Sequence, residues 1–321
     1  MASFRTSAIT LFFAGLAAAT CATTAGSGWS VSYGQAVDQV GYDNASLHQN
    51  YEDAPYGPMA FRVHNGELWL LDSTRGRILA YAPDGKQKYN LTLPGVATNT
   101  LLEDLALVPA PDGTVGSIWV GDGADLFIRH IRVSDGAELA RIGKAKGHFQ
   151  QIHQIEVGPS GRLYVGDFGR STISVFSPDG TLLREQPWER SGFVIGPDDR
   201  LSTIDFSSND GYFLRSYDAT GKLLQSVHLG QASAQNPRLW RVDTEGALVS
   251  FIPPSGYHGL IQLVRFGPAG QIRSRSLVRP AAMNRFLDPT ADGGAWRALA
   301  DFSVAPKGSF EIRMLPGNGD R

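Results

Sequence analysis

The chain has 321 residues, of which 42% are hydrophobic and 19% are charged, with 37 glycines and 18 prolines. Its formal net charge is −2, and no acidic or basic block interrupts it. This balance excludes an extended nucleic-acid-binding surface and a polybasic membrane patch. The glycine and proline content favours many tight turns over long helices.

Residues 1–25 differ from the rest of the chain. Arg5 is their only charged residue, and an apolar run extends from Ala8 to Ala19. This pattern is typical of a secretory signal peptide and is too short to span a membrane. We therefore expect an exported protein, periplasmic or extracellular, without a membrane span. The single cysteine, Cys21, lies in this segment, so a mature chain cut after it has no thiol, and lipidation of Cys21 is left open.

Residues 26–54 form a lead-in to the regular part of the chain. Apolar and polar residues alternate from Trp29 to Tyr33, and the stretch that follows is polar. We predict that residues 29–34 or 36–41 supply a strand that closes a ring by pairing with the end of the chain. A disordered leader is the alternative.

The stretch from His153 to Arg184 predicts four strands in a row, because short β-branched and aromatic runs alternate with Gly-, Pro- and Asp-rich turns. The same spacing recurs upstream: a turn glycine precedes an aspartate by six residues, and that aspartate precedes the glycine of a Pro-Asp-Gly turn by 13. The residues concerned are Gly66, Asp72 and Gly85 in one copy and Gly161, Asp167 and Gly180 in the other.

The repeats run over 55–97, 98–147 and 148–190, followed by three more divergent copies, the last from Asn284. Internal repeats of this length are typical of propellers. We predict an all-β fold, a single-domain six-bladed β-propeller of four-stranded antiparallel blades over residues 55–321, and a monomer.

Two repeats carry a recognisable motif. In the first, LWLLD at 68–72 is followed by Arg77-Ile78 and by YAPDG at 81–85; in the third, LYVGD at 163–167 is followed by Thr172-Ile173 and by FSPDG at 176–180. These motifs resemble the NHL repeat of six-bladed propellers in the TolB-like and gluconolactonase-like superfamily. The resemblance implies the fold but selects no function, because such propellers include binding modules, lyases, lactonases and hydrolases.

An aspartate follows the second strand of most repeats; the series is Asp72, Asp122, Asp167, Asp205 and Asp301. A ring of carboxylates is one interpretation. A residue repeated in every blade usually serves the blade, so we interpret these aspartates as acceptors for N–H groups of the adjacent turns.

Functional residues are expected where blades differ, at the entrance to the central channel. Aligning the first apolar pair of each repeat places these residues at equivalent blade starts: Glu103, His153, Ser191, Arg238, Asn284 and, in the first repeat, Tyr56 or Pro58. We take Glu103, His153 and Arg238 as catalytic candidates and Ser191 and Asn284 as binding candidates. A wet, polar channel that binds only water is the alternative.

Loops between strands offer a second candidate surface. Arg170 follows Phe168 in one loop, and Tyr257-His258 lies in the longest and most divergent loop. Aromatic and arginine side chains on loops suit recognition of a protein or a glycan.

The resemblance also raises a metal hypothesis. Similar peptide-amidating lyases hold zinc with histidines from several blade starts, whereas here His153 alone occupies such a position. Gluconolactonase-like propellers use Glu and Asn or Asp, for which Glu103 and Asn284 are candidates. A Ca²⁺ or Zn²⁺ ion at Glu103 and His153 is therefore left open.

Two functions follow from these observations. The first is a recognition module that binds a protein, a glycan or a small-molecule ligand through its loop face and channel mouth. The second is a metal-dependent, lactonase-like hydrolase or lyase with its site at the channel. The sequence does not decide whether the protein is an enzyme.

Overall fold

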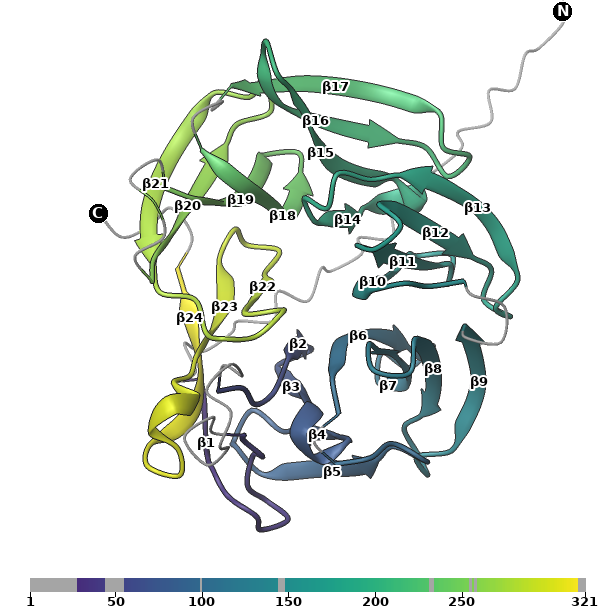
Figure 1. Cartoon of the computed structure of the whole chain (residues 1–321), viewed down its shortest axis with the longest axis vertical. Coiled ribbons are helices and arrows are strands. Elements are labelled where there is room, and N and C mark those ends of the chain that lie inside the picture. Colours follow the sequence, from purple (N-terminus) through teal and green to yellow (C-terminus); the bar gives the residue numbers. More distant parts are fainter. Residues whose placement is uncertain are drawn as a thin grey trace, which may run out of the picture.

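The computed structural model describes residues 28–43, 55–98, 100–143, 148–230, 234–253, 256 and 259–316. These residues form six sheets of four antiparallel strands, arranged in a ring around a central axis (Figure 1). The predicted six-bladed β-propeller is confirmed. We call the end of the axis at which the innermost strands begin the channel mouth.

Each of the first five blades takes four consecutive strands, ordered from the axis outward (Figure 1). Blades one to three comprise β2 Ala60–His64, β3 Glu67–Asp72, β4 Arg77–Tyr81 and β5 Gln87–Thr92; β6 Leu102–Pro109, β7 Val115–Asp122, β8 Phe127–Arg132 and β9 Glu138–Gly143; and β10 Ile152–Val157, β11 Leu163–Asp167, β12 Thr172–Phe176 and β13 Leu182–Pro187. Blades four and five comprise β14 Phe193–Ile195, β15 Leu201–Ser207, β16 Gly211–Tyr217 and β17 Leu223–Gly230; and β18 Gln235–Asp243, β19 Gly246–Ile252, β20 Ile261–Phe266 and β21 Ile272–Val278.

The sixth blade combines both ends of the chain. From the axis outward it consists of β22 Leu287–Pro289, β23 Ala295–Leu299, β24 Ser309–Leu315 and β1 Trp29–Ser32. Strand β1 pairs antiparallel with β24, and the Trp29 indole nitrogen donates to the main-chain oxygen of Ala82 in blade one at 2.9 Å. The N-terminal strand therefore fastens the last blade to the first.

The Pro-Asp-Gly turns sit between the third and fourth strands of their blades. Gly85 and Gly180 have φ angles of 81° and 87°, in the left-handed region that glycine adopts without strain. Each glycine N–H donates at 2.9 Å to a carbonyl three residues earlier, which closes the turn. The spacing seen in the sequence is thus the spacing of these hairpins.

The core lies between neighbouring blades. Trp69 of blade one packs in a cluster with Ile118 of blade two, and Trp119 of blade two packs in a cluster with Ile155 of blade three. Because second strands are covered on both faces, they read as continuous apolar runs: β3 is buried at every position after Glu67. This packing fixes the innermost strands, and so the groups at the mouth.

Three short 3₁₀ helices occur within the described segments, η2 Ser73–Arg75, η3 Pro197–Asp199 and η4 Phe302–Val304. No helix in this part of the chain is long and apolar enough to cross a membrane. The predicted signal peptide with Cys21 lies outside the described residues, and so do Tyr257 and His258.

Candidate functional site

The innermost strands of blades two and three each contain an irregularity at the end nearest the channel mouth. The register of β6 against β7 shifts between Leu102 and Asp104, so Glu103 is an extra residue in the ladder. The register of β10 against β11 shifts in the same way around His153. Such bulges redirect the extra side chain and are common beside functional sites.

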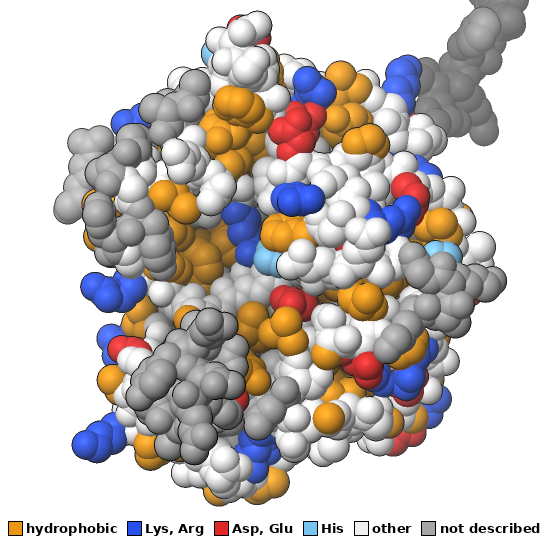
Figure 2. Space-filling model, in the orientation of Figure 1, with side chains coloured by type: hydrophobic (Ala, Val, Ile, Leu, Met, Phe, Trp, Pro, Cys, Tyr) orange, Lys and Arg blue, Asp and Glu red, His pale blue; other side chains and the backbone are white. Residues whose placement is uncertain are grey.

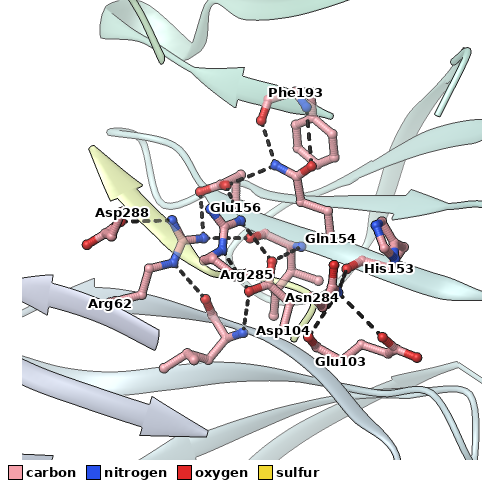
Figure 3. A network of polar contacts seen from close by, with 12 residues as sticks. Arg62, Glu103, Asp104, His153, Gln154, Glu156, Phe193, Asn284, Arg285 and Asp288 are labelled. Carbon is pink, nitrogen blue, oxygen red and sulfur yellow. Dashed lines mark hydrogen bonds and ion pairs between the residues drawn. The ribbon is translucent and has the colours of Figure 1, made fainter. Parts of the chain in front are cut away.

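Asn284 joins three of the predicted residues (Figure 3). Its amide nitrogen donates to the main-chain oxygen of Glu103 at 3.0 Å, to a Glu103 carboxyl oxygen at 3.4 Å and to the main-chain oxygen of His153. Its Oδ1 accepts from Arg238 Nη1 at 3.0 Å. The structure thus brings Glu103, His153, Arg238 and Asn284 together from four blades, and we call them the mouth cluster.

The Glu103 carboxyl group is buried, with the residue 8% exposed. Burial raises its pKa to about 7, the neighbouring Asp104 carboxylate adds to the rise, and the Arg238 guanidinium opposes it. Near neutral pH, Glu103 therefore exchanges between a carboxylate and a neutral carboxylic acid that can donate a hydrogen bond.

His153 is held as a neutral imidazole. Its ring stacks on Phe168, with 3.8 Å between ring centroids and an interplanar angle of 24°. Burial lowers the pKa of His153 to about 3, and the positive charge of Arg238 lowers it further. At neutral pH the ring consequently offers one N–H donor and one nitrogen acceptor.

Arg238 supplies the positive charge of the mouth cluster. Its guanidinium lies over the Trp240 ring, 4.5 Å from the centroid, and Nη1 also donates to the main-chain oxygen of Asn284 at 2.6 Å. Burial lowers its pKa to about 9, assisted by the nearby Arg285. Nη2 is buried and has no hydrogen-bond partner, so the cluster holds an unused donor.

An ion-pair network lies beneath the mouth, seen in Figure 3, and we call it the central network: Arg62, Asp104, Glu156, Arg285 and Asp288. Arg285 donates through Nε and Nη2 to both oxygens of Asp104 at 2.9 Å and through Nη2 to Glu156 at 2.7 Å. Burial alone would raise the pKa of Asp104, but Arg285 holds it below its ordinary value.

Arg62 completes the central network from blade one. It donates to Glu156 at 2.9 Å and to the main-chain oxygens of Leu105 and Ile155 at 3.0 and 3.1 Å, and it approaches Asp288 at 3.7 Å. Four blades are thereby tied at the axis. These residues were not predicted as a group, although charged residues alternating with apolar ones on innermost strands are a signal that could have indicated them.

Other predicted residues lie outside the mouth cluster. Ser191 is buried, and its hydroxyl is bonded to the main chain of Ile204 in its own blade. Arg170 forms a two-point ion pair with Glu185, at 2.6 and 3.0 Å, near the outer edge of blade three. These side chains stabilise their blades.

Three of the five repeated aspartates accept N–H groups of adjacent turns, as interpreted from the sequence, and two do not. Asp122, Asp167 and Asp301 accept hydrogen bonds from main-chain N–H groups two or three residues later in the chain. Asp72 accepts one from the lead-in segment, and Asp205 pairs with an arginine of β16 at 2.9 Å. They do not form a ring of carboxylates at the mouth.

A zinc ion would find too few side-chain ligands among the described residues. Among these residues, no group of three or more His, Cys, Asp or Glu side chains is arranged to hold an ion, whereas protein zinc sites use at least three. The Asn284 amide oxygen is bonded to Arg238, whose positive charge also disfavours a cation beside Glu103 and His153.

Figure 2 shows basic, histidine and acidic side chains gathered around a hollow near the centre of one face. A separate groove of about 260 Å³ lies between blades five and six, where β18 ends at Asp243. Arg241, Arg265 and Arg273 line it. Two of them are neutralised, since Arg241 pairs with Asp243 at 2.7 Å and Arg273 with a glutamate at 3.0 Å.

We found no protein-family model that matches this chain, and no curated protein matches its sequence. Solved structures do match. Virginiamycin B lyase from Staphylococcus aureus is 16% identical, with 82% of this chain and 85% of that chain covered and a TM-score of 0.51. Luciferin-regenerating enzyme is 14% identical over 82% and 92% of the two chains, with a TM-score of 0.52.

Hydrazine synthase from Kuenenia stuttgartiensis is 13% identical, over 81% of this chain and 87% of that chain, with a TM-score of 0.52. At these identities the likeness concerns the fold alone. The chain is a six-bladed β-propeller whose structural neighbours include virginiamycin B lyase.

Proposed function

We propose that the protein is an exported, NHL-type recognition module that binds its protein or glycan ligand by a group inserted into the channel mouth. The observation that supports this proposal is the mouth cluster, in which Asn284 holds together polar groups from four blades. Binding sites typically place a few oriented polar groups among apolar side chains, and here Phe168 and Trp240 supply the apolar surfaces.

This proposal is tested by glycan arrays and peptide libraries with the wild type, Arg238→Gln and the control Arg200→Gln. Arg200 is exposed and lies at the opposite end of its blade, after the first strand β14. Binders of the wild type should be lost with Arg238→Gln and kept with Arg200→Gln. Binders that persist with a folded Arg238→Gln would contradict a site at the mouth.

A hydrolase or lyase at the same place is the second candidate. It is favoured by Glu103, because a carboxyl group whose pKa is raised to about 7 suits general acid–base catalysis at neutral pH. The metal-dependent form of this hypothesis would need a third ligand besides Glu103 and His153. Metal content of the purified protein and a panel of lactones and esters, each with the wild type and Glu103→Gln, would separate these forms. Turnover that Glu103→Gln abolishes would support the enzyme.

A further inference from the structure

Two buried arginines of this protein, Arg285 and Arg129, bind a carboxylate through the Nε–Nη2 edge of the guanidinium. Arg285 binds Asp104 through Nε and Nη2, at 2.9 Å each. Arg129 binds Asp122 through the same two nitrogens, at 3.1 and 2.9 Å, both to the single oxygen Oδ2. This edge presents two parallel N–H groups that match the two oxygens of a carboxylate.

In Arg238 the same edge is free among the described residues. The hydrogen bonds of its guanidinium to described residues use Nη1 alone, and Nη2 is buried without a partner. No described carboxylate forms an ion pair with it, although a buried guanidinium is normally paired. Nη2 is buried, so neighbouring side chains must move aside for a ligand acceptor to reach it.

We propose that the ligand carries a carboxylate group, which binds the Nε–Nη2 edge of Arg238. This inference rests on the proposed function, since it names the chemistry recognised at the same site. A carboxylate is favoured over a phosphate because the mouth offers one free guanidinium edge, while Asp104 and Glu156 beneath it would repel a second negative charge. Protonated Glu103 would donate a hydrogen bond to the same group.

Binding should consequently take up a proton. A carboxylate on Arg238 would raise the pKa of Glu103 above its free value of about 7, so affinity should fall as the pH rises past 7. The charged groups that act on Glu103 are Asp104 and Arg238, and His153 is held beside it by Asn284. His153 is already neutral in this range, because its pKa is about 3.

Calorimetric titrations with matched acids and amides test the inference. The probes are glucuronate against glucuronamide, and N-acetylalanine against N-acetylalaninamide, which separate a sugar acid from a peptide carboxyl terminus. We expect at least one acid to bind about tenfold or more tightly than its amide. Arg238→Gln should weaken the binding of that acid about tenfold or more, and Arg200→Gln should leave its binding unchanged. Arg238→Lys, which keeps the charge but lacks the two-point edge, should give an intermediate loss.

The outcomes are distinguishable. Acid and amide that bind equally well, and that Arg238→Gln weakens equally, would overturn the carboxylate while a site at the mouth remains. Binding of an acid that neither Arg238→Gln nor Arg238→Lys weakens would overturn both the carboxylate and the site at the mouth. No binding by any acid or amide would overturn both the carboxylate and the proposed site for these ligand classes. Arg238→Lys serves as the test if Arg238→Gln does not fold, as judged by circular dichroism.

Discussion

The amide nitrogen of Asn284 donates to the main-chain oxygen of Glu103 at 3.0 Å, although 181 positions separate the two residues in sequence. The same side chain binds the main-chain oxygen of His153 and the guanidinium of Arg238. Because Asn284 precedes the innermost strand of blade six, one amide sets the relative positions of groups from blades two, three and five. The geometry of the mouth therefore depends on a single side chain that itself carries no charge.

Asn284→Ala should lower the free energy of unfolding by about 1–3 kcal/mol, because two buried carbonyl groups and Arg238 Nη1 lose a partner. Urea unfolding measures this change. Asn90→Ala is the matched control: its amide donates to Val37 at an exposed position, so its cost should stay below about 1 kcal/mol. Equal losses in both variants would mean that Asn284 does not organise the mouth.

Glu103→Gln should raise the free energy of unfolding at pH 8 by on the order of 1–3 kcal/mol. At pH 4.5 it should change that free energy little. The folded pKa of Glu103 is raised to about 7, above an unfolded value of about 4.3. Folded wild type therefore holds a proton that the unfolded chain releases, and its stability falls as the pH rises from about 4.3 to 7.

Urea unfolding at the two pH values checks this dependence. Glu245→Gln is the control, since Glu245 is exposed and lies at the far end of blade five; it should show no such difference. A Glu103→Gln variant that is equally destabilised at both pH values would indicate that Glu103 is ionised throughout.

Asp104→Asn should cost about 3–5 kcal/mol at pH 7, because it leaves Arg285 buried with half of its carboxylate partners. Asp84→Asn, which removes an exposed pair with Lys86, should change the free energy of unfolding far less, because water and salt screen an exposed pair. Since Arg285 lowers the folded pKa of Asp104, the stabilisation is present above the unfolded pKa of about 3.9 and is lost as the pH falls below it. The difference between wild type and Asp104→Asn should therefore narrow in acid, and a constant difference would contradict the ion pair as its cause.

Phe168→Ala should raise the pKa of His153 from about 3 toward its ordinary value, by about one unit or more, because water reaches the ring once its stacking partner is gone. A nuclear magnetic resonance titration of the histidine ring signals measures the shift. Phe213→Ala, which removes a ring beside His228, should leave the pKa of His153 unchanged. An unaltered pKa in Phe168→Ala would show that Arg238, and not burial, holds His153 neutral.

The sequence predicted the propeller because its turns need particular residues at fixed spacing. Gly85 and Gly180 have left-handed backbone conformations in equivalent turns. Their equal distance in sequence from Asp72 and Asp167 therefore reflects the strand and turn lengths that recur in each blade. The same regularity located the blade starts, and Glu103 and His153 were found because they stand just before the apolar pairs of two innermost strands.

The contacts between blades at the axis could not be predicted from the repeat spacing of the sequence. The pairing of Asp104 with Arg285 joins blades two and six across the axis, and no periodicity within a blade specifies which residues meet there. The bulges around Glu103 and His153 depend on how two strands align. Ser191 shares the equivalent blade start, yet its hydroxyl turns back to its own main chain.

A crystal structure with glucuronate or N-acetylalanine bound would test the site at the channel mouth most directly. We predict the carboxylate against Nε and Nη2 of Arg238, within hydrogen-bond distance of Glu103. A carboxylate found in the groove lined by Arg241, Arg265 and Arg273, with the mouth closed around an unchanged Arg238, would contradict it.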